Sequence, residues 1–168
     1  SCVMNLRSTL IGRLAFASLA LGLTGTVARA ENEYENAPIR YSETPPRDAA
    51  QQLEKDQIAG KVKLPRGSAW DTLHGLLKQW NIPQESQVMV FSKTSLQLRR
   101  IMPSRPRAVY FNDDMYIGYC QQGDVLEVAA IDGQQGTIFY TLGQPNSDEP
   151  DEKPLFVRDK GQCLTCHA

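Results

Sequence analysis

The stretch AVYFNDDMYIGYC, residues 108–120, decides the fold. Two short runs rich in aromatic and β-branched residues flank Asn112, Asp113 and Asp114. Polar turn residues between two such runs are typical of a β-hairpin. We therefore expect two antiparallel strands joined by a tight turn at this point of the chain.

Further strands are predicted on both sides of this hairpin. The segment DGQQG (132–136) separates two of them and forms another hairpin-like connection. The predicted strands are QVMVFS (87–92), SLQLRRI (95–101), DVLEVAAI (124–131) and TIFYTL (137–142). Residues 48–145 are accordingly predicted to form an α+β domain, a mostly antiparallel sheet with one or two short helices on a face.

The first of these helices is expected directly after residue 47. Asp48 can cap its N-terminus, Gln51 occupies the capping-box position, and Gly60 is expected to end it. Its predicted apolar face is thin and consists of Ala49, Leu53 and Ile58.

A second, longer helix is expected to begin at Ser68. Ser68 and Asp71 match the S-x-x-D capping pattern, and Ile82-Pro83 is expected to stop the helix. Its predicted apolar stripe consists of Trp70, Leu73, Leu76, Leu77 and Trp80.

Residues 1–30 have the pattern of a secretory signal peptide, with Met4 as the expected true start. Arg7 and Arg13 are positive, residues 14–27 are apolar, and Ala28-Arg29-Ala30 matches an A-x-A cleavage signal. The alternative, a membrane anchor, is disfavoured because an apolar run of 14 residues is shorter than the about 20 that span a bilayer. The sequence thus predicts a periplasmic or otherwise exported protein with no stable membrane span after cleavage.

The mature chain is expected to begin at Glu31. Residues 31–47 contain three prolines and are predicted to be an extended arm, and residues 146–158 are predicted to be an acidic, proline-rich linker with a short strand. Cleavage leaves 15 basic and 19 acidic residues, a net charge of −4. This acidic balance argues against a nucleic acid as the partner.

The last residues carry the strongest functional motif, Cys163-Leu164-Thr165-Cys166-His167. C-x-x-C-H is the attachment signature of c-type haem. A helical turn places the two sulfurs toward the same porphyrin edge, and the histidine after the second cysteine can become the proximal iron ligand. We therefore expect one covalent haem c, with Cys163 and Cys166 as thioether anchors and His167 on the iron. The fold prediction accordingly ends with the start of a haem c segment at residues 159–168.

Three other interpretations of this motif remain. A structural zinc site usually needs four ligands, and only one Cys pair and one His occur here. A thioredoxin-like redox motif belongs after an early strand of a βαβ unit, which does not precede it. A disulfide between Cys163 and Cys166 would close a very short loop.

The sixth iron ligand has two candidates, His74 and Met102. His74 borders the apolar stripe of the second helix, where a packing role is the alternative. Met102 precedes Pro103 in a proline-rich loop, a common setting for a methionine ligand. Met89 and Met115 lie in predicted strands and are expected in the core.

Two further features of the sequence are a group of arginines and a third cysteine of the mature chain. Arg99, Arg100, Arg105 and Arg107 form a basic cluster that could pair with haem propionates or an acidic partner, or could simply be a solvated face. Cys120 ends a predicted strand and is expected to be a buried free thiol.

Several stretches resemble one family of uncharacterised exported bacterial proteins, described as cytochrome c domain-containing proteins with a single C-x-x-C-H motif. They are VFSKTSLQ (90–97), PRAVYFNDDMYIGY (106–119), GDVLEVAAID (123–132), GTIFYTL (136–142) and the final CLTCH. The resemblance covers residues 38–168 and implies a haem role for Cys163, Cys166 and His167. Members of that family continue past the motif, so the resemblance also implies a C-terminally truncated chain that lacks its natural sixth ligand.

The function expected from these observations is electron transfer by a covalently bound haem, to a redox partner protein that the sequence does not identify. An enzyme is less expected, because no second catalytic group accompanies the motif. The alternatives are a haem-dependent enzyme or gas sensor with an open iron position, and a non-haem periplasmic binding module in which the two cysteines form a disulfide.

Overall fold

The structure is a computed structural model that describes residues 32–65, 67–143 and 156–167. The chain divides into two units, 1–30 and 31–168, and all described residues belong to the second. The predicted signal peptide and most of the predicted 146–158 linker lie outside the described residues, so both stay predictions. Within the described part, no helix is both long enough and apolar enough to cross a membrane.

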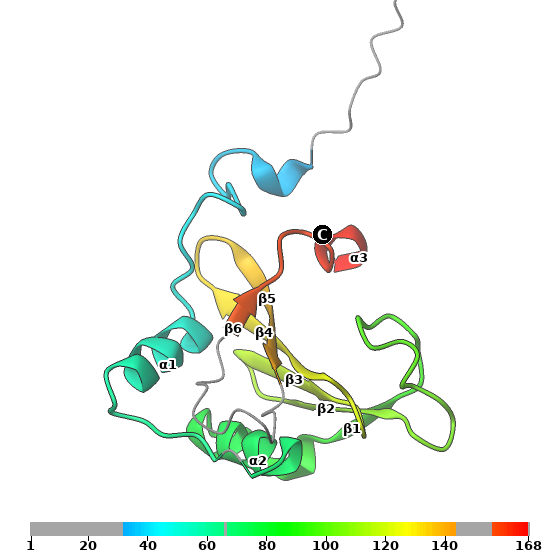
Figure 1. The fold of residues 1–168 in the computed structure, drawn as a ribbon. Helices are drawn as coiled ribbons and strands as arrows, with labels where there is room; N and C mark the ends of the chain where they lie inside the picture. The colour runs from blue at the N-terminus through cyan, green and yellow to red at the C-terminus, as the bar shows by residue number, and fades with distance from the viewer. Residues whose placement is uncertain (1–31, 66, 144–155, 168) are drawn as a thin grey trace, which may run out of the picture. The chain divides into compact units, whose positions relative to one another are not determined.

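The domain is built on one antiparallel sheet whose strands follow chain order (Figure 1). Its strands are β1 (Val88–Val90), β2 (Arg107–Phe111), β3 (Met115–Tyr119), β4 (Val125–Asp132), β5 (Gly136–Gly143) and β6 (Phe156–Arg158). β4 and β5 form the longest pair, with Val128 opposite Tyr140. The predicted α+β class with an antiparallel sheet is confirmed, and both predicted hairpins occur.

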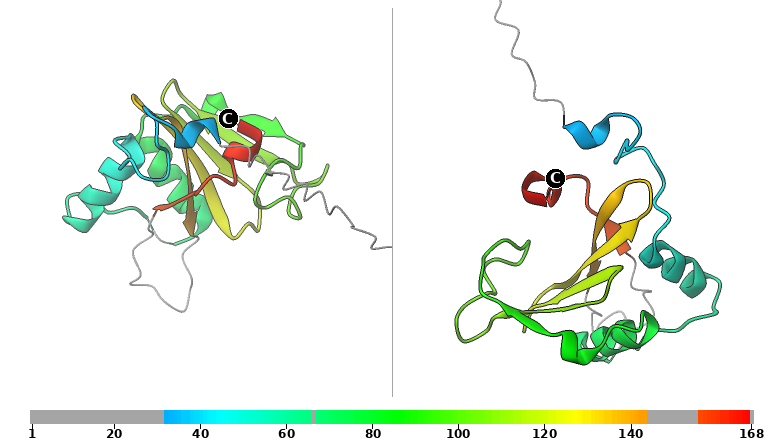
Figure 2. Two further views of the ribbon diagram at one scale, coloured as in Figure 1. Left: turned by 90° about the horizontal axis from the view of Figure 1, so that it is seen from above. Right: turned by 180° about the vertical axis from the view of Figure 1, so that it is seen from behind.

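Two helices, α1 (Ala49–Ile58) and α2 (Ala69–Gln79), lie on one side of this sheet, and the short C-terminal helix α3 (Leu164–His167) lies on the other (Figure 2). Two 3₁₀ turns, η1 (Glu33–Glu35) and η2 (Gln84–Ser86), complete the elements. The helices and the facing side chains of the strands enclose the core. Its largest fully buried members include Leu73, Leu76, Ile117, Leu126, Ile138, Tyr140 and Leu142.

α1 begins as its sequence indicates but buries a different face. The Asp48 carboxylate accepts hydrogen bonds from the N–H groups of Ala50 and Gln51, and it also accepts one from the Tyr140 hydroxyl at 2.5 Å. The predicted apolar face was wrong for two of its three residues, because Ala49 and Ile58 are exposed. The buried residues are Ala50, Leu53 and Gln57. The hydrogen bond from Tyr140 fixes the first turn of α1 against β5.

α2 follows the predicted stripe at its centre. Ser68 caps it by accepting from the Asp71 N–H at 3.1 Å, and Leu73, Leu76 and Leu77 are buried. Trp70, expected in the stripe, is 48% exposed and packs on the ring of Tyr119.

The segment SLQLRRI was predicted as a strand and is instead a series of turns. In place of strand pairing, the buried side chain of Gln97 bonds to the main chain at the start of β4. Its amide nitrogen donates to Val125 O at 2.9 Å, and its amide oxygen accepts from Asp124 N at 2.7 Å. Met89 was also predicted wrongly as core, since it lies on the edge strand β1 and is 48% exposed. Met115 is buried as expected.

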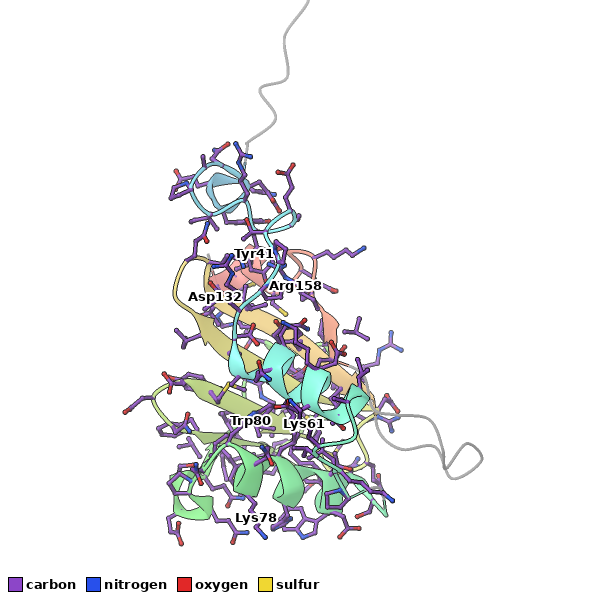
Figure 3. All side chains as sticks on the ribbon, turned by 90° about the vertical axis from the view of Figure 1, so that its left-hand side faces the viewer. Tyr41, Lys61, Lys78, Trp80, Asp132 and Arg158 are labelled. Atoms are coloured by element: carbon purple, nitrogen blue, oxygen red, sulfur yellow. The ribbon has the colours of Figure 1, made fainter. Side chains whose placement is uncertain are left out.

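Residues 32–47 do not form the predicted extended arm, because they fold back onto β5 and β6. Tyr41 is almost fully buried, and the guanidinium of Arg158 lies 4.3 Å from its ring centroid (Figure 3). Arg158 also donates hydrogen bonds to Tyr41 O, to Thr44 O at 2.9 Å and to the Gln135 side chain at 2.8 Å. One side chain of β6 therefore fastens this N-terminal segment and the β4–β5 turn.

Replacing this arginine should destabilise the whole domain. We expect Arg158→Ala to lower the free energy of unfolding by about 3 kcal/mol, because three acceptors and an aromatic face lose a charged donor. Urea unfolding followed by circular dichroism measures the change. Arg99→Ala, which removes an exposed arginine, is the control and should shift stability by no more than about 0.5 kcal/mol. A loss of less than about 1 kcal/mol for Arg158→Ala would contradict this account.

Candidate functional site

The sheet face that α1 and α2 leave uncovered forms the floor of a pocket of about 600 Å³, called the sheet pocket below. Side chains alternate between the two faces of a strand, so the residues between the core positions of β2–β5 point into it. Its floor consists of Val109, Gly118, Ala129, Ile131, Phe139 and Thr141. One wall is formed by residues 94–96 and the opposite wall by the C-terminal segment.

Gly118 is part of this floor and is itself buried. A Cβ atom at this position would meet the side chains of Arg107 and Glu127 at 3.4–3.5 Å, which is ordinary contact. Glycine is therefore not required by a close approach. The side chains of Arg107 and Glu127, which pair with each other at 2.8 Å, lie next to this glycine.

The C-x-x-C-H motif forms a helical turn at the pocket wall. The carbonyl oxygen of Cys163 accepts hydrogen bonds from both Cys166 N and His167 N, each at 3.2 Å. Leu164 points into the core and is 7% exposed, whereas Cys163, Cys166 and His167 all line the sheet pocket. The turn thus buries one side chain and directs three others toward the sheet pocket.

His167 lies over the aromatic floor. Its ring centroid is 5.4 Å from that of Phe139, with the two planes tilted by 38°. The imidazole is exposed, so a ring nitrogen is accessible to a ligand in the pocket.

Cys163 and Cys166 are free thiols that differ in their surroundings. Cys166 is exposed and Cys163 is half-buried. Burial, and then the nearby carboxylates of Asp159 and Glu127, raise the pKa of Cys163 to about 11, so its thiol stays protonated at neutral pH.

Asp159 and Glu127 were not singled out from the sequence, and both line the pocket. The Asp159 carboxylate accepts from the N–H groups of Gly161 and Cys163, each at 2.9 Å. Its position four residues before the first cysteine is a turn signal that sequence reasoning could have used. Glu127 has no such local signal, because only the register of β4 brings it beside the motif.

Glu127 also holds the second wall of the pocket. It accepts from Arg107 at 2.8 Å, from the Ser95 hydroxyl at 2.7 Å and from Leu96 N at 2.9 Å. The ion pair is largely buried, with each side chain 16% exposed. Ser95 and Leu96 donate the remaining hydrogen bonds of the carboxylate, whereas the buried Arg107 Nε has no partner among the described residues.

The two candidates for the sixth ligand do not reach the sheet pocket. His74 lies on α2, on the other side of the sheet, and its Nδ1 is 2.8 Å from Trp70 O. Met102 forms an isolated bridge with Arg105, whose guanidinium lies 3.4 Å from the methionine sulfur. The structure therefore brings Cys163, Cys166 and His167 together and places His74 and Met102 elsewhere.

The basic cluster is dispersed. Arg100 pairs with the exposed Asp124 at 3.1 Å, Arg105 contacts Gln122, and Arg99 is exposed, so only Arg107 faces the pocket. Cys120 is a buried free thiol, as expected, and burial raises its pKa. Among the described residues, no three His, Cys, Asp or Glu side chains gather as a metal site would require.

No protein-family model, no curated protein and no solved structure matches the chain. The resemblance to cytochrome c domain-containing proteins therefore stays a prediction.

The unequal surroundings of the two motif thiols predict unequal reactivity. At pH 8 about one Cys163 in a thousand is a thiolate, given its raised pKa, so iodoacetamide should modify the exposed Cys166 first, by at least about tenfold. Peptide mass spectrometry of the reduced protein at timed intervals measures both rates. The Cys163 rate should rise about tenfold per pH unit up to about pH 10. Equal rates at pH 8, with the buried Cys120 still protected, would contradict this assignment.

Proposed function

We propose that this chain is an exported c-type cytochrome that binds one haem covalently and transfers electrons. One observation carries the proposal: the two thiols and the imidazole of a C-x-x-C-H motif occupy one helical turn and face a pocket on an otherwise uncovered sheet face. The signal-like pattern of residues 1–30 supports export to a compartment where haem c is assembled.

The sheet pocket fits a flat, largely apolar group. Its volume lies within the roughly 300–1,000 Å³ of ligand sites, and its floor of Val109, Ala129, Ile131 and Phe139 is apolar. Cys163, Cys166 and His167 would hold the haem from the wall.

The residues of the motif would act as follows. Each cysteine thiol adds across one vinyl C=C bond, so that sulfur bonds to one carbon and the thiol proton goes to the other, and no oxidant is needed. His167, whose ring lies 5.4 Å from that of Phe139, would supply a ring nitrogen as the proximal ligand. When bound, the haem iron takes up and releases one electron. The chain supplies the covalent hold, the proximal ligand and an apolar floor that keeps water from one side.

Covalent haem is the direct test. Co-expressed with a periplasmic haem-attachment system, the protein should retain haem after denaturation and acid extraction. Cys163→Ser or Cys166→Ser should leave at most one thioether bond and sharply lower the yield. Cys120→Ser is the matched control, since that thiol is buried outside the pocket lining and its loss should leave haem content unchanged.

The decisive negative result is a denatured chain without a haem mass adduct, while a control cytochrome from the same cells carries one. In that case the non-haem binding module with a Cys163–Cys166 disulfide becomes the better account.

A haem-dependent enzyme or gas sensor is the second candidate, favoured by the lining of the pocket. Among the described residues that line it, His167 is the one histidine and none is a methionine. The side of the iron away from His167 would then be open to a small ligand.

Carbon monoxide distinguishes the two functions. If the second side is open, the dithionite-reduced, haem-loaded chain should bind carbon monoxide, with a shift of its Soret band. The shift should be absent if a side chain occupies that position. His167→Ala is the control for the proximal side, because it should alter the spectrum before any carbon monoxide is added.

A further inference from the structure

We propose that Asp159 is the positioning residue of the attachment motif: its carboxylate fixes the place of Cys163 and, through Cys163, of Cys166 and His167. This inference rests on the proposed function, because it names the residue that presents the motif to haem.

Asp159 is itself rigidly held. It directly follows β6, and its N–H donates to Phe139 O at 2.8 Å, which extends the β5–β6 pairing by one residue. The preceding residue, Arg158, is bound to Tyr41, Thr44 and Gln135. The carboxylate therefore starts from a backbone position that both the sheet and the N-terminal segment fix.

From this position the carboxylate closes the turn that leads into the motif. A single oxygen, Oδ2, accepts from both Gly161 N and Cys163 N at 2.9 Å. Gly161 has a φ of +109°, which side-chain-bearing residues rarely adopt, and a Cβ there would lie 3.0 Å from the Tyr34 hydroxyl. The turn therefore needs glycine at position 161, and the Asp159 oxygen closes it by accepting two N–H groups.

The position of Cys163 then determines the rest of the motif. Its carbonyl oxygen accepts the N–H groups of Cys166 and His167, so the three functional residues form one hydrogen-bonded unit. Leu164 is buried on one side of this unit, and the sheet pocket lies on the other. Without the Asp159 oxygen, the N–H of Cys163 loses its acceptor, and Cys163 is free to turn away from the pocket.

An aspartate in this role can be replaced by asparagine but not by alanine or glutamate. Asparagine keeps an oxygen at the same distance from the backbone, whereas glutamate keeps the charge and moves the oxygen one bond further away. The comparison therefore separates hydrogen-bond geometry from charge. Asp124→Ala is the matched control, because that carboxylate is exposed and lies outside the pocket lining.

The test uses the reduced, folded full chain mixed with ferrous protohaem, so that attachment depends on the folded turn. Intact mass after denaturation counts covalent adducts, and peptide mapping shows which sulfur carries each bond. Wild type, Asp159→Asn and Asp124→Ala should form adducts bonded through both cysteines. Asp159→Ala and Asp159→Glu should form about tenfold fewer of them, a difference of about 1.4 kcal/mol, and the remaining adducts should be bonded through Cys166 alone.

A retained vinyl group leaves a spectroscopic signature as well, because its conjugation shifts the α-band of the pyridine haemochrome to longer wavelength. Circular dichroism of each apoprotein checks that the variants fold. If Asp159→Ala does not fold, the asparagine and glutamate variants decide the question.

Equal two-bond attachment in Asp159→Glu and wild type overturns the positioning role, and so does equal attachment in a folded Asp159→Ala. Equal failure of Asp159→Asn and Asp159→Glu also overturns it, because an oxygen kept in the same place would then not be sufficient to position the motif. Failure of the wild type to bind haem at all is a different result, since it removes the proposed function and this inference together.

Discussion

The hydrogen bonds of Arg158 are the interaction on which the rest of the structure depends. This side chain extends from the last strand and is held by two main-chain oxygens of the N-terminal segment and by Gln135 of the β4–β5 turn. Asp132, close by at the end of β4, accepts the N–H groups of Arg47, Gln134 and Gln135 (Figure 3). Burial acts to raise the pKa of Asp132, but these donors and the Arg158 charge outweigh it, so its pKa lies below the usual range. The N-terminal segment, the β4–β5 turn and β6, which are distant in sequence, therefore meet around the charges of Arg158 and Asp132.

The sequence predicted the elements that depend on local chemistry. The Asp48 and Ser68 caps, the two hairpins and the antiparallel sheet are visible because capping and alternation act over a few residues. The elements that depend on distant partners were predicted wrongly. Residues 95–101 alternate like a strand, yet the buried Gln97 side chain bonds β4 and holds a turn instead. The N-terminal segment looks extended because its partner, Arg158, comes more than a hundred residues later.

The candidate site divides in the same way. Spacing alone identifies Cys163, Cys166 and His167, since the motif is contiguous. Glu127 and Phe139 become visible only once the register places alternate residues of β4 and β5 on the open face. His74 and Met102 were reasonable from residue type, but a helix on the opposite side and an Arg105 contact place them away from the motif.

The two faces of the sheet are covered differently, because α1 and α2 close the first face and the attachment motif lies on the second. α1 and α2 close the first face with alanine and leucine side chains, which join buried isoleucine, leucine and tyrosine side chains of the strands in one core. The motif touches this core through Leu164 only. Its position on the second face is instead fixed by polar contacts, those of Arg158, Asp159 and the Cys163 carbonyl. Hydrogen bonds are directional, whereas apolar packing tolerates sliding. The hydrogen bonds of Asp159 and of the Cys163 carbonyl therefore give the two thiols and the imidazole a defined orientation. The apolar core makes the domain stable, and the chain from Arg158 to Cys163 gives the motif its place on the domain.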